Sequence, residues 1–280
     1  MSDFLSQMAR SSAKRAAKAK QSESEADLRD RAADLPPPLP LQLHASGFDL
    51  IAEVKREAPS AGVLANSDDP EVVIKQADSY VRGGAAALSV LTEPEMFRGS
   101  LDDLAIAARA VPVPVMRKDF LVDPYQVFEA RAAGAAGVLL ILRLLDDARL
   151  GEMIDAASEA GLFVLLEAFD DDDLGRAGDL VPISTEHGIQ TLVGLNARDL
   201  ATLEIDNQRL ADLAGAFPKG VPRVAESGLA TPEDAGRMAA LGYQVALVGS
   251  ALMRADDPSK LTATMIDAGR TESLRECASA

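Results

Sequence analysis

The chain has 280 residues, and 48 % of them are hydrophobic, so it can bury a core large enough for one large α/β domain. Its 28 basic and 44 acidic residues give a net charge of −16, which repels nucleic acid and anionic membranes. Aromatic residues make up only 4 % and tryptophan is absent, so stacking platforms for single-stranded bases are scarce. We therefore expect neither nucleic acid nor membrane as a partner. An anionic small molecule could still bind where basic groups converge in one cleft.

The residues that usually hold metals or form disulfides are rare. Cys277 is the single cysteine, and His44 and His187 are far apart in the sequence. This excludes a disulfide framework and makes a transition-metal site improbable. No apolar run reaches the roughly 18 residues of a membrane span, and the basic N-terminus is not followed by a signal-like apolar run. We predict a cytoplasmic protein without a bound metal.

Residues 1–47 differ in composition from the rest of the chain. Residues 11–34 are rich in alanine and charged residues, which predicts a helix, and the Pro-rich stretch at 36–40 ends it with an extended connector. We expect residues 1–47 to form an N-terminal helical extension and residues 48–280 to form the main domain. The composition leaves two fates open for the extension, a mobile tail or a helix packed on the domain.

From residue 48 onward, apolar runs typical of strands alternate with amphipathic helical patterns. The expected strands cover 49–55, 86–91, 113–118, 137–142, 162–167, 191–196, 222–226 and 244–248. The expected helices cover 70–83, 100–110, 124–134, 146–160, 170–178, 206–216, 231–241 and 256–268. Eight such units in series predict a parallel sheet closed into a (β/α)8 barrel, the TIM barrel. A doubly wound open sheet is the alternative, but no GxGxxG pattern follows the first strand.

Charged and polar residues stand where the expected strands end. Because side chains alternate along a strand, Glu53 and Lys55 share a face, as do Lys118 and Phe120. Asn196 and Arg198 form a third pair of this kind, and Glu167 and Glu226 end two further strands. In a barrel these side chains converge at the C-terminal rim, where active sites lie. Structural ion pairs remain the alternative for any one of these residues, but not for the whole set.

Two glycine- and serine-containing turns follow the seventh and eighth strands. They read Glu226-Ser227-Gly228 and Val248-Gly249-Ser250. In phosphate-binding barrels these two loops hold a phosphate through backbone N–H groups, which glycine lets approach closely. Two ordinary tight turns would be the alternative reading of each loop alone.

These residues together resemble the indole-3-glycerol phosphate synthase family, from about residue 48 to 258. The motifs that carry the resemblance are Ile51–Arg56 with Pro59-Ser60, Ser89–Pro94 with Phe97 and Gly99-Ser100, Arg117–Phe120 with Asp123–Gln126, Glu167, Gly194–Leu200, Ala225–Gly228 and Val248–Met253. The resemblance implies closure of an indole ring on 1-(2-carboxyphenylamino)-1-deoxyribulose 5-phosphate, with loss of CO2 and water. It implies no cofactor and a phosphorylated small molecule as partner. We expect a monomer or weak homodimer, and the sequence does not decide between them.

The resemblance also implies a role for each site residue. Lys118 corresponds to the acid for ring closure, and Lys55, Glu53 and Glu167 to the groups for dehydration, whose division stays open. The remaining groups are Asn196, Arg198, Glu226, Ser227 and Ser60 for substrate positioning, Phe97 and Phe120 around the aromatic ring, and Gly228, Gly249 and Ser250 with Lys55 at the phosphate. A helix before the first strand is also implied, which favours packing of the extension over the rim through Phe4, Leu5 and Met8.

The chain departs from the family pattern at several places. Ala58 and Ala61 stand where the family usually has serine and lysine, in a loop expected to touch substrate. The segment 179–190 is longer than the usual connection, and we expect it to be a loop with His187 on the surface. Arg56 and Glu57 are expected to form a solvated pair.

Three competing functions remain to be weighed. Phosphoribosylanthranilate isomerases share the barrel but use a cysteine near the first strand, which this chain lacks. A lyase that releases indole would not need two lysines. A non-catalytic or secondary-pathway barrel would be expected to lose Lys118 or Glu167, and both are present.

Overall fold

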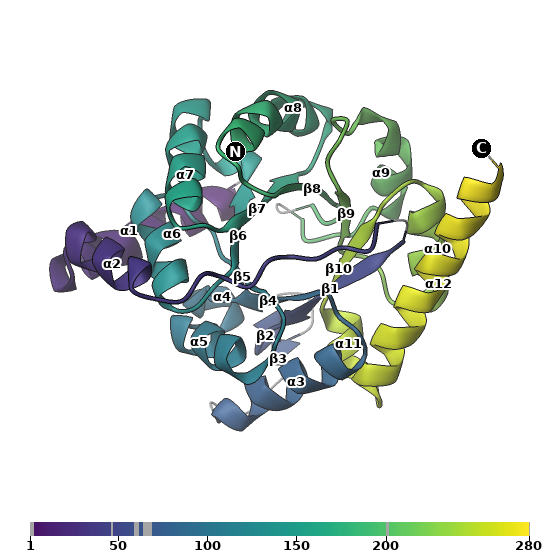
Figure 1. The fold of residues 1–280 in the computed structure, drawn as a ribbon, viewed down its shortest axis with the longest axis horizontal. Helices are drawn as coiled ribbons and strands as arrows, with labels where there is room; N and C mark the ends of the chain where they lie inside the picture. Colours follow the sequence, from purple (N-terminus) through teal and green to yellow (C-terminus); the bar gives the residue numbers. More distant parts are fainter. Residues whose placement is uncertain (1–2, 46, 59–61, 64–68, 200–201, 280) are drawn as a thin grey trace.

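The computed structural model describes residues 3–45, 47–58, 62–63, 69–199 and 202–279, and it contains a closed barrel of eight parallel strands (Figure 1). The strands are β1 (Asp49–Val54), β4 (Ala87–Leu91), β5 (Val115–Lys118), β6 (Gly137–Ile141), β7 (Phe163–Ala168), β8 (Thr191–Asn196), β9 (Arg223–Glu226) and β10 (Val245–Val248). The barrel closes through β1, which pairs with β10 on one side and with β4 on the other. The predicted TIM barrel is confirmed, and the open sheet is excluded.

Helices surround the barrel and fill the connections between its strands (Figure 1). They are α3 (Pro70–Arg82), α4 (Pro94–Phe97), α5 (Leu101–Ala110), α6 (Pro124–Ala132), α7 (Asp147–Glu159), α8 (Asp171–Glu186), α9 (Asn207–Asp212), α10 (Pro232–Ala240), α11 (Ser250–Arg254) and α12 (Pro258–Ser279), with short 3₁₀ turns at Leu142–Leu144 and Ala214–Ala216. Pro124 and Pro232 occupy first-turn positions behind the N-caps Asp123 and Thr231, and both helices begin with a capping box. Local sequence therefore sets where these helices start.

Strand alternation divides the core into two layers. Leu50, Ala52 and Val54 pack outward against the helices, whereas Ile51 points into the barrel. Glu53 lies on the same inward face as Ile51, two residues nearer the C-terminal end of the strand. The inward face is thus apolar in the middle of the barrel and polar at its C-terminal rim.

The N-terminal extension contains two helices where the sequence predicted one. Helix α1 (Asp3–Ser22) is followed by α2 (Glu25–Ala33), and Ser24 between them caps α2 by accepting a hydrogen bond from the Asp27 N–H. Serine in this position competes with the continuing helix for backbone hydrogen bonds, which is why the chain turns here.

The extension contacts the barrel at both ends. The connector after α2 crosses one end of the barrel on its way to β1 (Figure 1). There Leu41 is buried against Ala136 and Phe163, at the N-terminal ends of β6 and β7. At the opposite end, Leu5 and Met8 of α1 are buried in the same interior cluster. The expectation of a packed helix over the rim is therefore confirmed.

The expected loop at 179–190 is wrong, because α8 continues through it to Glu186. Leu174, Ala177, Val181 and Ser184 are buried at spacings of three or four, so the apolar helical face extends past the predicted end. His187 follows as the C-cap and lies at the surface, with its Nδ1 3.1 Å from Asp155 Oδ1.

The expected solvated pair of Arg56 and Glu57 is also wrong. Arg56 is buried, and its guanidinium contacts both carboxylate oxygens of Asp103 in α5, at 3.0 and 2.6 Å. This bidentate pair anchors the start of the β1–α3 connection, where β2 (Glu57–Ala58) and β3 (Gly62–Val63) form a small antiparallel ladder. No helix among the described residues is both long and apolar enough to cross a membrane.

Candidate active site

A cavity of about 540 Å³ opens at the C-terminal rim of the barrel, and it brings the predicted site residues together. Its lining includes Glu53, Lys55, Phe97, Lys118, Phe120, Glu167, Asn196, Arg198, Glu226, Ser227, Gly228, Gly249 and Ser250. Ser60 and Ala61 lie outside the described residues. The three residue pairs that were placed on one face by strand alternation all line the cavity.

Lys118 stands at the centre of a buried charge cluster. Its Nζ lies 3.2 Å from Glu167 Oε1 and 3.3 Å from Glu226 Oε2. Asn196 donates from Nδ2 to Glu167 Oε1 at 2.8 Å. The lysine comes from β5 and its two partners from β7 and β9, so the curvature of the barrel brings this group together.

A second ion pair lies on the β1 side of the cavity. Lys55 donates to Glu53 Oε1, and both side chains are largely buried, at 9 % and 7 % exposure. Losing either partner of a buried pair of this kind would leave an unpaired charge in the protein interior, which is strongly destabilising.

The environment shifts the pKa values of the site in different directions. Burial, with the negative charge of Glu167, raises the pKa of Glu226 to about 8 against the opposing effect of Lys118. Burial alone would lower the pKa of Lys118, but Glu167, Glu226 and Glu53 outweigh it and raise that pKa. Burial is likewise outweighed at Glu53, where the charges of Lys55 and Lys118 lower the pKa. Near pH 7 the site thus holds a charged lysine and a protonated carboxyl side by side.

Two glycines leave room for the carboxylates. A Cβ at Gly194 in β8 would overlap Glu226 Oε1, and a Cβ at Gly249 would overlap Glu53 Oε1. Glu226 Oε1 is itself buried without a hydrogen-bond partner among the described residues. A buried carboxylate oxygen in this state is available to a ligand that donates a hydrogen bond.

The turn after β9 has an unusual backbone. Ser227 and Gly228 both have positive φ angles, 67° and 78°. A positive φ is rare for a residue other than glycine, and such strain concentrates at functional sites. The N–H groups of Ser227, Gly228 and Gly249 donate to no acceptor among the described residues, and these residues line the cavity. Consecutive amides of this kind can receive an anion.

Aromatic side chains form an apolar wall on the other side. The Phe120 and Phe97 ring centroids lie 6.4 Å apart, and Phe4 of α1 meets Phe120 edge-on at 5.8 Å. Leu203 and Ile205, from the β8–α9 connection, also line the cavity. Sequence reasoning missed these two residues, because nothing local distinguishes them from other loop residues.

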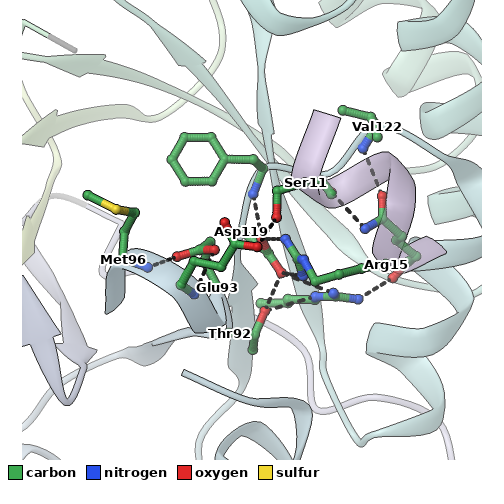
Figure 2. A network of polar contacts seen from close by, with 12 residues as sticks. Ser11, Arg15, Thr92, Glu93, Met96, Asp119 and Val122 are labelled. Atoms are coloured by element: carbon green, nitrogen blue, oxygen red, sulfur yellow. Dashed lines mark hydrogen bonds and ion pairs between the residues drawn. The ribbon is translucent and has the colours of Figure 1, made fainter. Parts of the chain in front are cut away.

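A buried polar network behind the site ties α1 to β5, and Figure 2 shows it from close by. Arg15 of α1 forms a bidentate pair with Asp119, at 2.9 and 2.8 Å. Asp119 also accepts hydrogen bonds from Thr92 and Arg117 and from the backbone N–H of Phe120. These donors outweigh burial, so the pKa of Asp119 lies far below its usual value. Through Asp119, the network holds the backbone between the two site residues Lys118 and Phe120 in place.

A metal is not suggested by the described side chains, among which no group of three or more His, Cys, Asp or Glu residues could hold one. The polar groups that line the cavity are instead suited to acid–base chemistry on an anionic organic molecule.

Comparison with known proteins identifies the family. Residues 5–265 match the family model described as indole-3-glycerol phosphate synthase, so the match includes most of the N-terminal extension. The chain is 46 % identical over 235 residues to an indole-3-glycerol phosphate synthase of Nocardioides sp., covering 83 % of this chain and 86 % of that protein. It is 42 % identical over 245 residues to that of Mycobacterium avium, covering 87 % and 86 %.

Solved structures with much lower identity share the fold. A 3-hexulose-6-phosphate synthase from Salmonella typhimurium matches with a TM-score of 0.63 at 18 % identity, covering 80 % of this chain and all of that one. A dihydropteroate synthase from Yersinia pestis matches with a TM-score of 0.60 at 15 % identity, covering 84 % and 96 %. These two likenesses concern the barrel alone. The family-model match and the identity to curated relatives show that this chain is a member of the indole-3-glycerol phosphate synthase family.

Proposed function

We propose that the chain catalyses the family reaction, the conversion of 1-(2-carboxyphenylamino)-1-deoxyribulose 5-phosphate to indole-3-glycerol phosphate, CO2 and water, and is thus a carboxy-lyase of tryptophan biosynthesis. The observation that carries the proposal is the buried cluster of Lys118 with Glu167 and Glu226 inside the rim cavity. A non-catalytic barrel would have no need to keep such a cluster, since buried charges cost free energy unless they are paired.

Ring closure begins when the ring carbon that bears the carboxylate attacks the substrate's carbonyl carbon. The carbonyl oxygen gains negative charge in this step and takes a proton, and Lys118 is placed to supply it. Its raised pKa keeps it charged before the reaction. Loss of CO2 then restores the aromatic ring. A positioned general acid of this kind contributes about 10²–10⁴-fold to the rate.

Dehydration removes the new hydroxyl group as water and needs an acid and a base. Lys55 with Glu53 can supply one proton transfer, and Glu167, held by Asn196, can supply another. Glu226 is mostly protonated near pH 7 because of its raised pKa. The division of these roles among the carboxylates stays open.

The remaining lining residues suit the other parts of the substrate. Phe97 and Phe120 offer an apolar wall to the aromatic ring, and Glu226 Oε1 can accept a hydrogen bond from a substrate hydroxyl group. The amides of Ser227, Gly228 and Gly249, with Ser250 and Lys55, form the proposed phosphate site. Arg198, whose pKa is lowered by burial, can orient the substrate from β8.

The test is turnover of the carboxyphenylamino substrate by the purified chain, followed by the rise in indole fluorescence. We expect product formation without added metal or cofactor. The matched control is Glu167→Gln, which keeps the shape of the side chain and removes its basicity, so kcat should fall at least about 10²-fold. An absence of turnover in a folded wild-type chain would refute the proposal.

A further inference from the structure

Arg254 at the end of α11 is a cation of the rim cavity that the site described so far does not use. Arg254 lines the cavity beside Gly249, Ser250 and Ala251, and it is exposed to solvent. It has no hydrogen-bond or ion-pair partner among the described residues. Every other lysine or arginine that lines the cavity has a polar partner in the protein.

The helix geometry places Arg254 next to the proposed phosphate site. Ser250 is the first residue of α11 and Arg254 is its last, four positions later. Residues four apart lie on the same face of a helix, with Cβ atoms about 5–6 Å apart. The arginine side chain is longer than that separation, so its guanidinium can reach a group bound at Ser250.

The charge balance of the cavity gives this arginine a function. Lys55 and Lys118 are each already paired with a glutamate of the protein, Glu53 and Glu167, and Arg198 donates to the Leu203 carbonyl, so all three cations are engaged before a substrate binds. A phosphorylated and carboxylated substrate brings several negative charges into a protein that already carries −16. Lys55, the other cation near the phosphate site, is held by Glu53.

We propose that Arg254 binds the substrate's phosphate at the mouth of the cavity, as a substrate-binding residue that supplements the backbone amides. Its planar guanidinium can donate two parallel hydrogen bonds to phosphate oxygens, which a lysine cannot do. This proposal rests on the proposed function, since it concerns the phosphate of that substrate. Arg254 lies away from the reacting groups, so it should contribute to binding equally before and during the reaction.

The test compares Arg254→Gln and Arg254→Lys with wild type in steady-state kinetics. We expect Arg254→Gln to raise KM about tenfold, the low end for a hydrogen bond to a charged group because the site is exposed, while kcat stays within about twofold. Arg254→Lys should give an intermediate KM because it keeps the charge and loses the fork. Inorganic phosphate, used as a competitive inhibitor, should bind the glutamine variant more weakly by a similar factor.

The matched control is Arg149→Gln, which removes the same charge from a residue on α7 whose side chain is 42 % exposed, pairs with Glu152 and does not line the cavity. Its KM and phosphate inhibition should equal those of wild type. An unchanged KM and phosphate inhibition in Arg254→Gln, or a fall in kcat without a change in KM, would overturn the proposal. Because these ratios require an active wild-type enzyme, failure of the proposed function itself would be recognised first, as absence of turnover.

Discussion

Replacement of Lys118 by methionine tests both the chemistry and the electrostatics of the site. Methionine keeps much of the apolar length of lysine and removes its charge. The change removes the lysine from between Glu167 and Glu226, whose side chains are 3 % and 1 % exposed, and leaves the two carboxyl groups facing each other. Two separate losses should follow, one in kcat and one in stability.

The magnitudes follow from the burial of the cluster. Without the acid for ring closure, kcat should fall at least about 10²–10⁴-fold. Removing one partner of a buried ion pair costs about 3–5 kcal/mol of unfolding free energy, and the low end applies because the Lys118 side chain is 16 % exposed. Lys118 also opposes the rise in the pKa of Glu226, so that pKa should rise above 8 in the variant. The stability loss should therefore be larger at pH 9 than at pH 6, where Glu226 is already protonated.

The assay combines steady-state kinetics with urea unfolding at pH 6 and pH 9. The control is the double variant Lys118→Met with Glu226→Gln, which removes one of the two unpaired carboxylates. It should recover the additional stability loss at pH 9, where Glu226 titrates, while kcat stays low at both pH values.

Two results would refute the reasoning. A Lys118→Met enzyme that keeps more than a tenth of wild-type kcat would show that another group protonates the carbonyl. Equal unfolding free energies of wild type and Lys118→Met at pH 9 would show that the two carboxylates do not depend on the lysine.

Three further predictions concern the supports of the site. Glu226 has a folded-state pKa of about 8 against an ordinary value of 4.5, so between these two pH values the folded protein holds a proton that the unfolded chain releases. The unfolding free energy should therefore decline by a few kcal/mol as pH rises from about 4.5 to 8. Urea unfolding at the two ends of this range should show the decline in wild type and its absence in Glu226→Gln. Gly194→Ala should lower kcat/KM at least about tenfold by displacing the Glu226 carboxyl group. The control Gly151→Ala on α7, where a Cβ meets open space, should keep activity and gain about 0.5–1 kcal/mol of unfolding free energy. Equal kinetics in the two variants would contradict the role of Gly194. Arg15→Met should lower the unfolding free energy by about 1–3 kcal/mol and raise KM, because it frees α1 and with it Phe4. The control Lys18→Met, on the exposed face of α1, should change neither quantity. Deletion of residues 1–40 should act like Arg15→Met but more strongly, and an unchanged melting temperature and KM after this deletion would show α1 to be dispensable.

The structure also changes how one substitution should be interpreted. Gly249→Val would be a natural probe of a phosphate site, with an effect on KM alone. Because a side chain at this position would overlap Glu53, we expect kcat to fall as well. Gly228 is no cleaner a probe, since it has a positive φ and a Cβ there would overlap Asn207 Oδ1.

The sequence alone determined the barrel and the convergence of its polar residues. Strand alternation has a period of two and helices a period of 3.6, and both are local properties that can be read from one stretch of chain. Once eight such units follow one another, Lys118, Glu167 and Asn196 must meet at the same rim, because parallel strands end on the same side. The caps at Asp123 and Thr231 are equally local, and these helices begin where the sequence indicates.

Only the tertiary structure decided which groups share a charge or a space. Arg15 and Asp119 are 104 positions apart and Arg56 and Asp103 are 47 apart, so no local pattern indicates either pair. The need for glycine at 194 arises from the Glu226 carboxyl group on the neighbouring strand. The expected end of α8 was wrong because burial of Val181 and Ser184 outweighs the helix-breaking tendency of Pro182. Such facts depend on the distance between side chains from different elements, which is fixed only when the barrel closes and the helices pack around it.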